Sequence, residues 1–345
     1  MSRTAVVVMN LGGPDTAEAV EPFLFNLFRD PAIIALPNPL RWLIAKLISR
    51  QRGPLARSIY AKIGSRSPLL DNTVAQAQAL ERTLGTDYRT FIAMRYWSPR
   101  ADETVKAVKA WNPDEVVLLP LYPQFSSTTT ASSLKDWQHA ARIAGLDRPT
   151  QMICCYPTEA GFIAALAERI REALDRWPDH LPAPRLLLSA HGLPKRIVAR
   201  GDPYQAQIEE TAAALRRALG RSDIESIICY QSRVGPLEWI SPATDAEIRR
   251  AGSEGKGLIV APIAFVSEHS ETLVELDIEY GHLAETSGVP HYDRVPTVGA
   301  MPSFITGLAR LVQQAQAERA MTPWPDGGAR RCSQMAALCP CQETR

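Results

Sequence analysis

Short apolar runs alternate along the chain with longer stretches that have a helical pattern. The runs are rich in β-branched residues and continuously apolar, as expected of strands buried on both faces of a sheet. The expected strands are Ala5–Met9, Thr90–Met94, Val116–Leu119, Gln151–Cys155, Arg185–Ser189, Ser226–Cys229 and Leu258–Ala261. The clearest expected helices are Ala75–Leu84, Thr158–Arg176, Gln205–Leu219, Ser270–Leu283 and Ser303–Ala320.

The alternation of strands and helices predicts an α/β fold with mostly parallel sheets, covered by helices on both sides. One strand ends in Asn10-Leu-Gly-Gly-Pro14 and a later one in the similar Ser189-Ala-His-Gly-Leu-Pro194. This echo predicts two similar doubly wound, Rossmann-like lobes, although so short a repeat can also arise by chance. Ligands of open α/β sheets bind beyond the carboxyl ends of the strands, so we expect an active-site cleft between the lobes.

With 345 residues, the chain is long enough for two domains of ordinary size. We expect an N-terminal lobe over residues 1–155 and a second lobe over residues 156–320, whose last helix can pack back on the first lobe. A separate tail is expected over residues 321–345. It begins with Thr322–Arg331, a segment with Pro, Gly and Arg but almost no apolar residue, which is typical of a linker.

The charge balance and the N-terminal sequence indicate which partners and which cellular location to expect. Lys and Arg number 38 against 37 Asp and Glu, so the basic field that nucleic-acid binding requires is missing, and no nucleic acid is expected as a partner. The N-terminus enters an apolar strand directly, without the marks of a secretory signal or transit peptide. No run reaches the roughly 18 consecutive apolar residues of a spanning helix. We therefore expect a cytoplasmic protein.

A histidine stands at the end of an expected strand. His191 follows Leu186–Ala190 directly and precedes Gly192, where a strand-end loop presents side chains to the expected cleft. Imidazole is the usual base near neutral pH, so His191 is a candidate for proton transfer. The alternative is a loop histidine held by hydrogen bonds.

A file of glutamates follows the strand that ends near Ala264. Glu271, Glu275 and Glu279 are four residues apart, so an α-helix places them on one face, with Glu268 extending the file. Such a file can pass protons or a hydrated metal ion. The alternative is a solvated acidic face whose first turn complements the helix dipole, with Ser267 as its cap. The position of His269, Glu271 and His191 at strand ends on the same predicted side favours a site.

Seven segments in order along the chain carry a resemblance to a known family. They are Val8–Pro14, Ile63–Pro68, Leu121–Ser126, Ser189–Pro194, Gly201–Pro203, Val234–Trp239 and Glu271–Tyr280. Together they make the chain similar to the ferrochelatases along essentially its whole length. The resemblance implies a chelatase-like fold and an enzyme that inserts ferrous iron into protoporphyrin to form haem. The alternatives are coproporphyrin as the substrate, a cobalt or nickel chelatase, and a porphyrin or haem carrier without catalysis.

The resemblance also implies roles for single residues. His191 and Glu271 would be the iron ligands, one of them taking the pyrrole protons, while Glu275 and Glu268 continue the acidic path and His269 supports Glu271. Aromatic rings would stack on the porphyrin and an arginine would pair with a propionate. Core packing is the alternative for the aromatic residues. The implied porphyrin-binding residues are Leu11, Arg52, Tyr60, Ser67, Tyr96 and Trp239.

The segment over residues 32–48 is too apolar for an ordinary surface loop, yet it carries Arg41 and Lys46. It resembles the hydrophobic lip of the family. A lip of this kind, with basic residues nearby, predicts peripheral contact with the inner face of an anionic membrane. The alternative is a core helix.

Three thiols crowd the tail in the motif Cys332-x6-Cys339-Pro-Cys341, a density that predicts metal binding. The resemblance implies a [2Fe-2S] cluster, whose fourth ligand would be Cys154 or Cys155, with Cys229 as the third choice. Ser127 stands where animal ferrochelatases have their internal cysteine. Zinc with another donor is the alternative for the tail, and a buried structural thiol for each internal cysteine. Both a monomer and a homodimer are compatible with the sequence.

Overall fold

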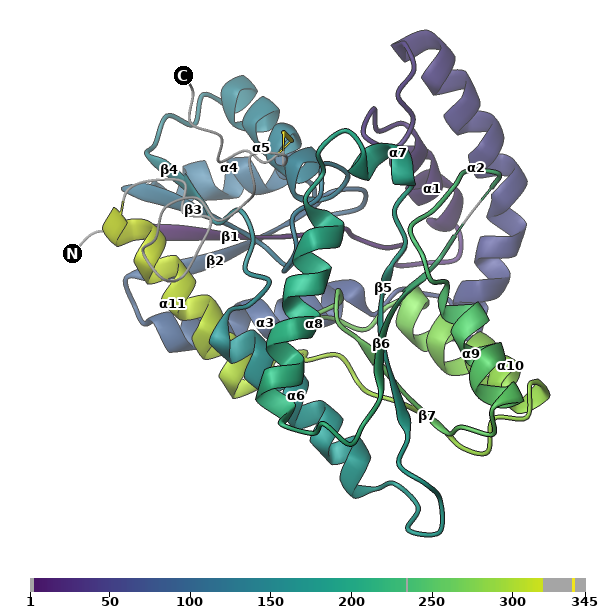
Figure 1. Cartoon of the computed structure of the whole chain (residues 1–345). Helices are drawn as coiled ribbons and strands as arrows, with labels where there is room; N and C mark the ends of the chain where they lie inside the picture. The colour runs from purple at the N-terminus through teal and green to yellow at the C-terminus, as the bar shows by residue number, and fades with distance from the viewer. Residues whose placement is uncertain (1–2, 234, 319–336, 339–345) are drawn as a thin grey trace. The chain divides into compact units, whose positions relative to one another are not determined.

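The computed structural model describes residues 3–233, 235–318 and 337–338, which form two compact α/β units (Figure 1). The first unit contains the described residues up to Cys155 together with the last helix from Leu308 onward. The second unit contains the residues from Tyr156 to Gly307. The expected linker and the cysteines Cys332, Cys339 and Cys341 lie outside the described residues.

Four parallel strands form the sheet of the first unit, in the order β2-β1-β3-β4. Figure 1 shows α4 and α5 on one face of this sheet and α3 with the end of α11 on the other. Both faces are thus covered, which explains why every residue of β1 is buried. The elements are β1 (Thr4–Asn10), α1 (Val20–Phe28), α2 (Asn38–Ala61), α3 (Leu69–Leu84), β2 (Tyr88–Met94), α4 (Ala101–Trp111), β3 (Glu115–Pro120), α5 (Thr130–Ala144), β4 (Thr150–Met152) and α11 (Pro302–Glu318).

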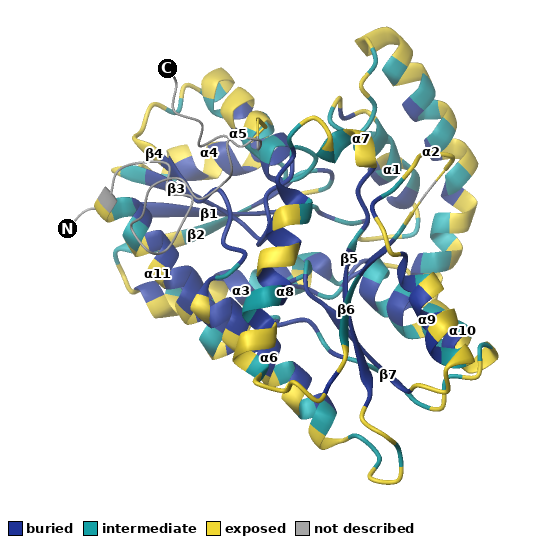
Figure 2. Ribbon diagram, viewed as in Figure 1, coloured by how far each residue is buried: buried dark blue, intermediate teal, exposed yellow. Residues whose placement is uncertain are grey.

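The sheet of the second unit is also parallel and has the order β6-β5-β7-β8. Helices α6 and α8 cover one face, and α9 and α10 cover the other, so the strands are buried along most of their length (Figure 2). The elements are α6 (Ala160–Asp175), β5 (Arg185–His191), α7 (Lys195–Val198), α8 (Tyr204–Leu219), β6 (Ser226–Gln231), α9 (Thr244–Ser253), β7 (Leu258–Pro262), the π-helix η1 (Glu271–Glu279), α10 (Tyr280–Thr286) and β8 (Tyr292–Arg294).

The two sheets repeat one topology. In each, the first strand of the unit has the second strand on one side and the third on the other, and the fourth follows at the edge. The chain therefore reverses its winding at β1 and again at β5, which is where ligands bind in doubly wound folds. β1 ends at Asn10 and β5 at His191, so the two loops that echo each other in sequence follow equivalent strands. The predicted pair of similar parallel lobes is confirmed.

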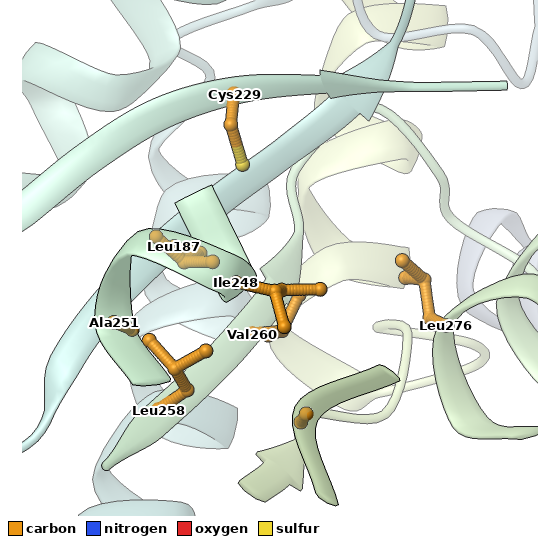
Figure 3. Packing of buried hydrophobic residues seen from close by; sticks show 8 residues of the cluster. Leu187, Cys229, Ile248, Ala251, Leu258, Val260 and Leu276 are labelled. Carbon is orange, nitrogen blue, oxygen red and sulfur yellow. The ribbon is translucent and has the colours of Figure 1, made fainter. Parts of the chain in front are cut away.

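The core of the second unit contains a cluster of fully buried side chains that joins the sheet to the π-helix (Figure 3). Leu276 of η1 belongs to this cluster together with Cys229 of β6 and Val260 of β7. Burial raises the pKa of the Cys229 thiol to about 12, as expected of a thiol in apolar surroundings. The cluster holds the acidic segment on the sheet by burial of apolar area.

Three details differ from the expected elements. The strand expected over Gln151–Cys155 ends at Met152, and the three-residue strand β8 was not predicted. The α-helix expected from Ser270 is wrong over its first part, because Glu271–Glu279 is a π-helix in which the N–H of Tyr280 donates to the carbonyl of Glu275. Ser270 rather than Ser267 precedes this helix. No helix in the described part of the chain has the length and apolarity needed to cross a membrane.

Candidate active site

Polar side chains of the second unit gather at the carboxyl ends of its central strands. His191 is the last residue of β5 and Gln231 the last residue of β6. Glu271 begins η1, which follows the loop after β7. The strands are parallel and β5 lies between β6 and β7, so all three strands end at the same edge of the sheet. His191, Gln231 and Glu271 therefore lie at this edge, at the point where the winding reverses.

Two imidazoles flank one carboxylate at this edge. Nε2 of His191 lies 3.6 Å from Oε1 of Glu271, and Nε2 of His269 lies 3.6 Å from its Oε2. The side chains of His191 and Glu271 are 38% and 30% exposed, whereas that of His269 is 11% exposed. A molecule arriving from solvent therefore meets His191 and Glu271, with His269 behind them.

The ring of His191 is oriented by the backbone that follows it. Its Nδ1 lies 2.6 Å from the carbonyl oxygen of Gly192. A carbonyl oxygen only accepts hydrogen bonds, so Nδ1 carries the proton and, in the neutral ring, Nε2 holds the lone pair. The hydroxyl of Tyr204 also donates to the carbonyl of His191, at 3.1 Å. The nitrogen that faces Glu271 is thus the one able to accept a proton or bind a metal.

The two histidines control the charge of Glu271. Burial raises the pKa of this carboxyl group, but the charge of His191 and the hydrogen bond and charge of His269 outweigh it and lower the pKa to about 2. Opposite charges within a few ångströms favour the ionised form of a carboxyl group. Glu271 is therefore an anion while these imidazoles are charged.

Glu275, one turn further along η1, is held by a set of donors. Its carboxylate accepts from Nε2 of Gln231 at 3.0 Å, from the N–H of Ser232 at 2.8 Å and from the hydroxyl of Tyr280 at 3.0 Å, and the Ser232 hydroxyl also donates to it. Burial and the charge of Glu271 nevertheless raise the pKa of Glu275. Two carboxyl groups of one helix are thus shifted in opposite directions.

Gln231 links the strands to the π-helix, and the sequence analysis missed it. Its side-chain oxygen accepts from the hydroxyl of Ser189 at 2.9 Å, and its amide nitrogen also donates to the backbone carbonyl of Glu271 at 3.0 Å. Ser232, which follows, has a φ of 61°, a conformation uncommon outside glycine and often found at functional sites. The available signal was a polar pair directly after an apolar strand, the same signal that identified His191.

A cavity of about 430 Å³ in the same unit is lined by Glu275 and Glu279. The carboxylates of η1 therefore run from Glu271, beside His191, to this cavity. The remaining lining residues are Arg233, Asp245, Arg249, Tyr280, His282, Leu283 and Thr286.

Glu268, which was expected to extend the acidic file, is tied to the sheet edge. Its Oε1 accepts from Nη1 of Arg294 at 2.6 Å and from the N–H of Thr297 at 2.8 Å. Burial acts to raise the pKa of Glu268, but the charge of Arg294 and these hydrogen bonds lower it overall. Its main partner is therefore a fixed arginine of β8.

Trp239 lies beside the histidine loop. Pro194 and Trp239 form an isolated antiparallel bridge, and a Cβ atom added to Gly192 would lie 3.1 Å from Cε3 of the indole. The buried Nε1 of Trp239 has no hydrogen-bond partner among the described residues. The structure thus brings one of the expected porphyrin-binding residues next to His191.

The other expected porphyrin-binding residues belong to the first unit. The N–H of Tyr96 donates to the carbonyl of Leu11 at 2.9 Å, and the N–H of Ser67 donates to that of Pro14 at 2.7 Å, so three of these residues meet at the loop after β1. Tyr96 is only 1% exposed, and its hydroxyl donates to Asp30, as expected of a core aromatic. Both remaining residues lie on α2, where Tyr60 is buried and the guanidinium of Arg52 lies 5.9 Å from the ring centre of Phe28.

The three cysteines of the described chain, Cys154, Cys155 and Cys229, are all buried. Within the described ranges, no group of three or more His, Cys, Asp or Glu side chains is arranged to hold a metal ion. The described residues alone therefore do not fit a resident cluster.

Comparison with known proteins agrees with this architecture. A sirohydrochlorin chelatase from Bacillus subtilis subspecies spizizenii, solved in complex with cobalt, shares the fold with a TM-score of 0.52 at 10% identity, over 92% of this chain and 96% of the other. The fold is thus that of the chelatases, as predicted.

The sequence comparisons are more specific. The family model of ferrochelatase matches residues 3–316. Ferrochelatases of Caulobacter vibrioides and Phenylobacterium zucineum are each 52% identical to this chain, over 99% of its length and 98% of theirs. The chain belongs to the ferrochelatase family. Ferrochelatases insert iron into a porphyrin, so the predicted enzyme class is confirmed.

Proposed function

We propose that the protein inserts ferrous iron into protoporphyrin to form haem, with His191 and Glu271 as the groups that meet iron and porphyrin. The observation that carries this proposal is the exposed pair of His191 Nε2 and Glu271 Oε1, 3.6 Å apart at the carboxyl end of β5. Membership of the ferrochelatase family supports the reaction. The residue roles rest on the geometry of the second unit.

His191 and Glu271 have different roles because they differ in charge. Metal insertion releases two pyrrole protons, and the Nε2 lone pair of His191 is oriented to accept one, because Nδ1 is held by Gly192. Glu271, whose pKa the charge of the imidazoles lowers, is the weaker base of the two and, as an anion, attracts ferrous iron. A pair of protein donors also suits a metal that must leave for the porphyrin, since closed four-ligand sites retain their metal.

We assign Glu275 to the removal of protons from the site. Its raised pKa makes it a better proton acceptor than Glu271, and Gln231 donates to both residues. Beyond Glu275, the cavity that Glu279 also lines offers an exit to solvent. Protons taken from the porphyrin would leave along this file.

The test is single-turnover insertion of ferrous iron under anaerobic conditions, with the porphyrin absorption bands giving way to those of haem. His191→Ala and Glu271→Gln should each slow insertion by at least about 10²-fold, the usual contribution of an acid–base group. Binding of protoporphyrin, measured by quenching of its fluorescence, should stay within a few-fold. His180→Ala, which removes an exposed histidine of the same unit, is the control. Near-normal insertion by either site variant would remove that residue from the reaction.

The same assay decides the porphyrin and the carrier alternative. We expect faster insertion into protoporphyrin than into coproporphyrin, which has more carboxylates on its rim. The opposite order would make this a coproporphyrin enzyme. Porphyrin binding without insertion would instead support a carrier.

We further propose that α2 rests on an anionic membrane surface. Its apolar side chains remain exposed, unlike those of a core helix, and Arg41 and Lys46 accompany them. Replacing Leu43 and Leu47 with Gln should lower binding to vesicles that contain anionic lipid by about tenfold or more. Ile143→Gln on α5, where the side chain is 72% exposed, is the control and should bind as before. The exposed large apolar residues of α2 are Leu40 (48%), Trp42 (44%), Leu43 (49%), Leu47 (58%) and Leu55 (61%).

We also propose a [2Fe-2S] cluster held by Cys332, Cys339 and Cys341 with one cysteine of the body of the chain. Support comes from the density of thiols in the tail and from the buried pair Cys154 and Cys155. Anaerobically purified protein should show a reddish iron–sulfur spectrum with matching iron and sulfide content. Replacing any tail cysteine with Ser should remove the colour, and the same change at Cys154, Cys155 and Cys229 identifies the fourth ligand. A colourless protein with bound zinc would overturn the cluster.

A further inference from the structure

The short edge strand β8 forms hydrogen bonds to the π-helix at two points. The guanidinium of Arg294 donates from Nε and Nη2 to the two carboxylate oxygens of Asp277, each at 2.6 Å. The hydroxyl of Tyr292 donates to the backbone carbonyl of Leu276 at 2.7 Å. Paired parallel bonds between a guanidinium and a carboxylate fix direction as well as distance. β8 therefore fixes the orientation of η1 around residues 276 and 277.

Arg294 has a second anchor on the other side of the catalytic segment. Its Nη1 donates to Glu268 at 2.6 Å, so one guanidinium joins residues that stand before and within η1. His269 and Glu271 lie between these anchors in the sequence. The side chain of Arg294 is 9% exposed, which limits competition from water and restricts its movement.

The double anchorage depends on where the helix begins. An α-helix has about 3.6 residues per turn, so nine residues amount to about two and a half turns. If an α-helix extended back to Glu268, that residue and Asp277 would point to opposite sides, and one arginine could not reach both. Glu268 instead lies before η1, in the loop that follows β7, and both carboxylates reach Arg294. The contacts of Arg294 thus fit a helix that begins after Glu268.

We propose that Arg294 is a positioning residue that ties Glu268, before η1, to Asp277 within it and so sets the place of the Glu271 carboxylate opposite His191. The inference rests on the proposed role of Glu271. Arg294 acts through the helix, since its contacts are with Glu268, Asp277 and the carbonyl of Val295. Gln231 holds the backbone of Glu271 from the side of the sheet, and Arg294 holds the same segment from its edge.

The same unit contains a matched control. Arg185 is 4% exposed and also joins two acidic residues, donating to Glu225 at 2.8 Å and to Glu254. It is the first residue of β5, whereas His191 is the last, so it lies at the opposite end of the strand from the site. Removal of either arginine takes a guanidinium partner from two carboxylates, and of the two arginines only Arg294 is connected to η1.

The experiment compares Arg294→Gln with Arg185→Gln in the full-length protein. Both should lower the melting temperature. Only Arg294→Gln should also lower the rate constant of iron insertion, by about 10- to 100-fold, because small displacements of reacting groups have effects of this size. The dissociation constant for protoporphyrin should stay within twofold. Hydrogen exchange should speed up at the amides of residues 271–280 in Arg294→Gln and remain slow there in Arg185→Gln.

Arg294→Lys keeps the charge but cannot form the paired bonds to Asp277, so its rate should fall between those of wild type and Arg294→Gln. It also serves as the test variant if Arg294→Gln does not fold. An unchanged insertion rate, or equal losses of rate in the two Gln variants, overturns the proposal. Glu271→Gln is measured in parallel. If that variant retains activity, the role of Glu271 fails, while the exchange rates still decide whether Arg294 holds the helix.

Discussion

A methyl group placed at Gly192 should slow the reaction as well as lower the stability of the fold. Gly192 follows His191, and its N–H donates to the carbonyl of Gln231 at 2.8 Å. A Cβ atom at this position would lie 2.8 Å from the same oxygen and 3.1 Å from Cε3 of Trp239. Contacts between carbon and oxygen are ordinarily about 3.3 Å or longer. Gly192→Ala therefore pushes the ends of β5 and β6 apart by roughly half an ångström.

This displacement sets the expected losses of stability and of insertion rate. Adding a methyl group to a tightly packed position usually lowers the free energy of unfolding by about 1–3 kcal/mol. A misplacement of about 1 Å at a reacting group can cost 10²-fold in rate, so half of it should cost about tenfold, or about 1.4 kcal/mol of the activation barrier. The affected geometry is the 3.6 Å pair of His191 and Glu271, since Gln231 also holds the backbone of Glu271.

The assay is single-turnover iron insertion by Gly192→Ala, together with urea unfolding. Gly252→Ala is the matched control, because its Cβ would lie even closer to a backbone oxygen, that of Ser287, near the end of α9 and away from the site. We expect the control to lose stability and keep its insertion rate. If Gly192→Ala inserts iron within twofold of wild type, or if both variants slow equally, the geometric reasoning is wrong.

Three further predictions concern η1. Leu276→Ala should lower the free energy of unfolding by about 2–5 kcal/mol in urea titrations, whereas Ile278→Ala, with its side chain 41% exposed, should cost much less. Glu275→Gln should slow insertion by about 10²-fold with unchanged porphyrin affinity; a normal rate in stopped-flow measurements would exclude the proton relay. Glu271 stabilises the fold above the ordinary carboxyl pKa of 4.5 and loses this effect as the pH falls towards its folded pKa of about 2. The stability difference between wild type and Glu271→Gln, at most about 3 kcal/mol, should therefore shrink between pH 6 and pH 3, and a constant difference would contradict the assigned pKa.

The sheets and the position of the site follow directly from sequence patterns. Continuous β-branched runs are distinctive because strands buried on both faces have no polar alternation, and seven of the eight strands in the described part of the chain were found this way. His191 and Glu271 stood out because polar residues at strand ends collect at one edge of a parallel sheet. The structure places Nε2 and Oε1 of this pair 3.6 Å apart, although their roles remain predictions.

The π-helix could not be predicted in the same way. Leu273 and Leu276 have the spacing of an α-helix. The structure buries Leu276 together with Thr272 and Val274, and leaves Leu273 only half-buried. A change in winding alters which positions face the core, and no local residue preference marks it. The three-residue strand β8 is short and only half-buried, so it gives no pattern. Arg294 was missed for the same reason, since its function depends on contacts with Glu268 and Asp277.

The two carboxyl groups of η1 explain why the site needs this helix. Glu271 and Glu275 are the same chemical group four residues apart, yet the imidazoles of His191 and His269 lower the pKa of the first, while burial and the charge of Glu271 raise that of the second. Pairs of titratable groups shifted apart in this way usually divide a reaction between an ion that stays charged and a group that carries protons. A cation is drawn to Glu271 and a proton to Glu275. Both effects depend on distances of a few ångströms, so whatever fixes η1 against the sheet also fixes the chemistry.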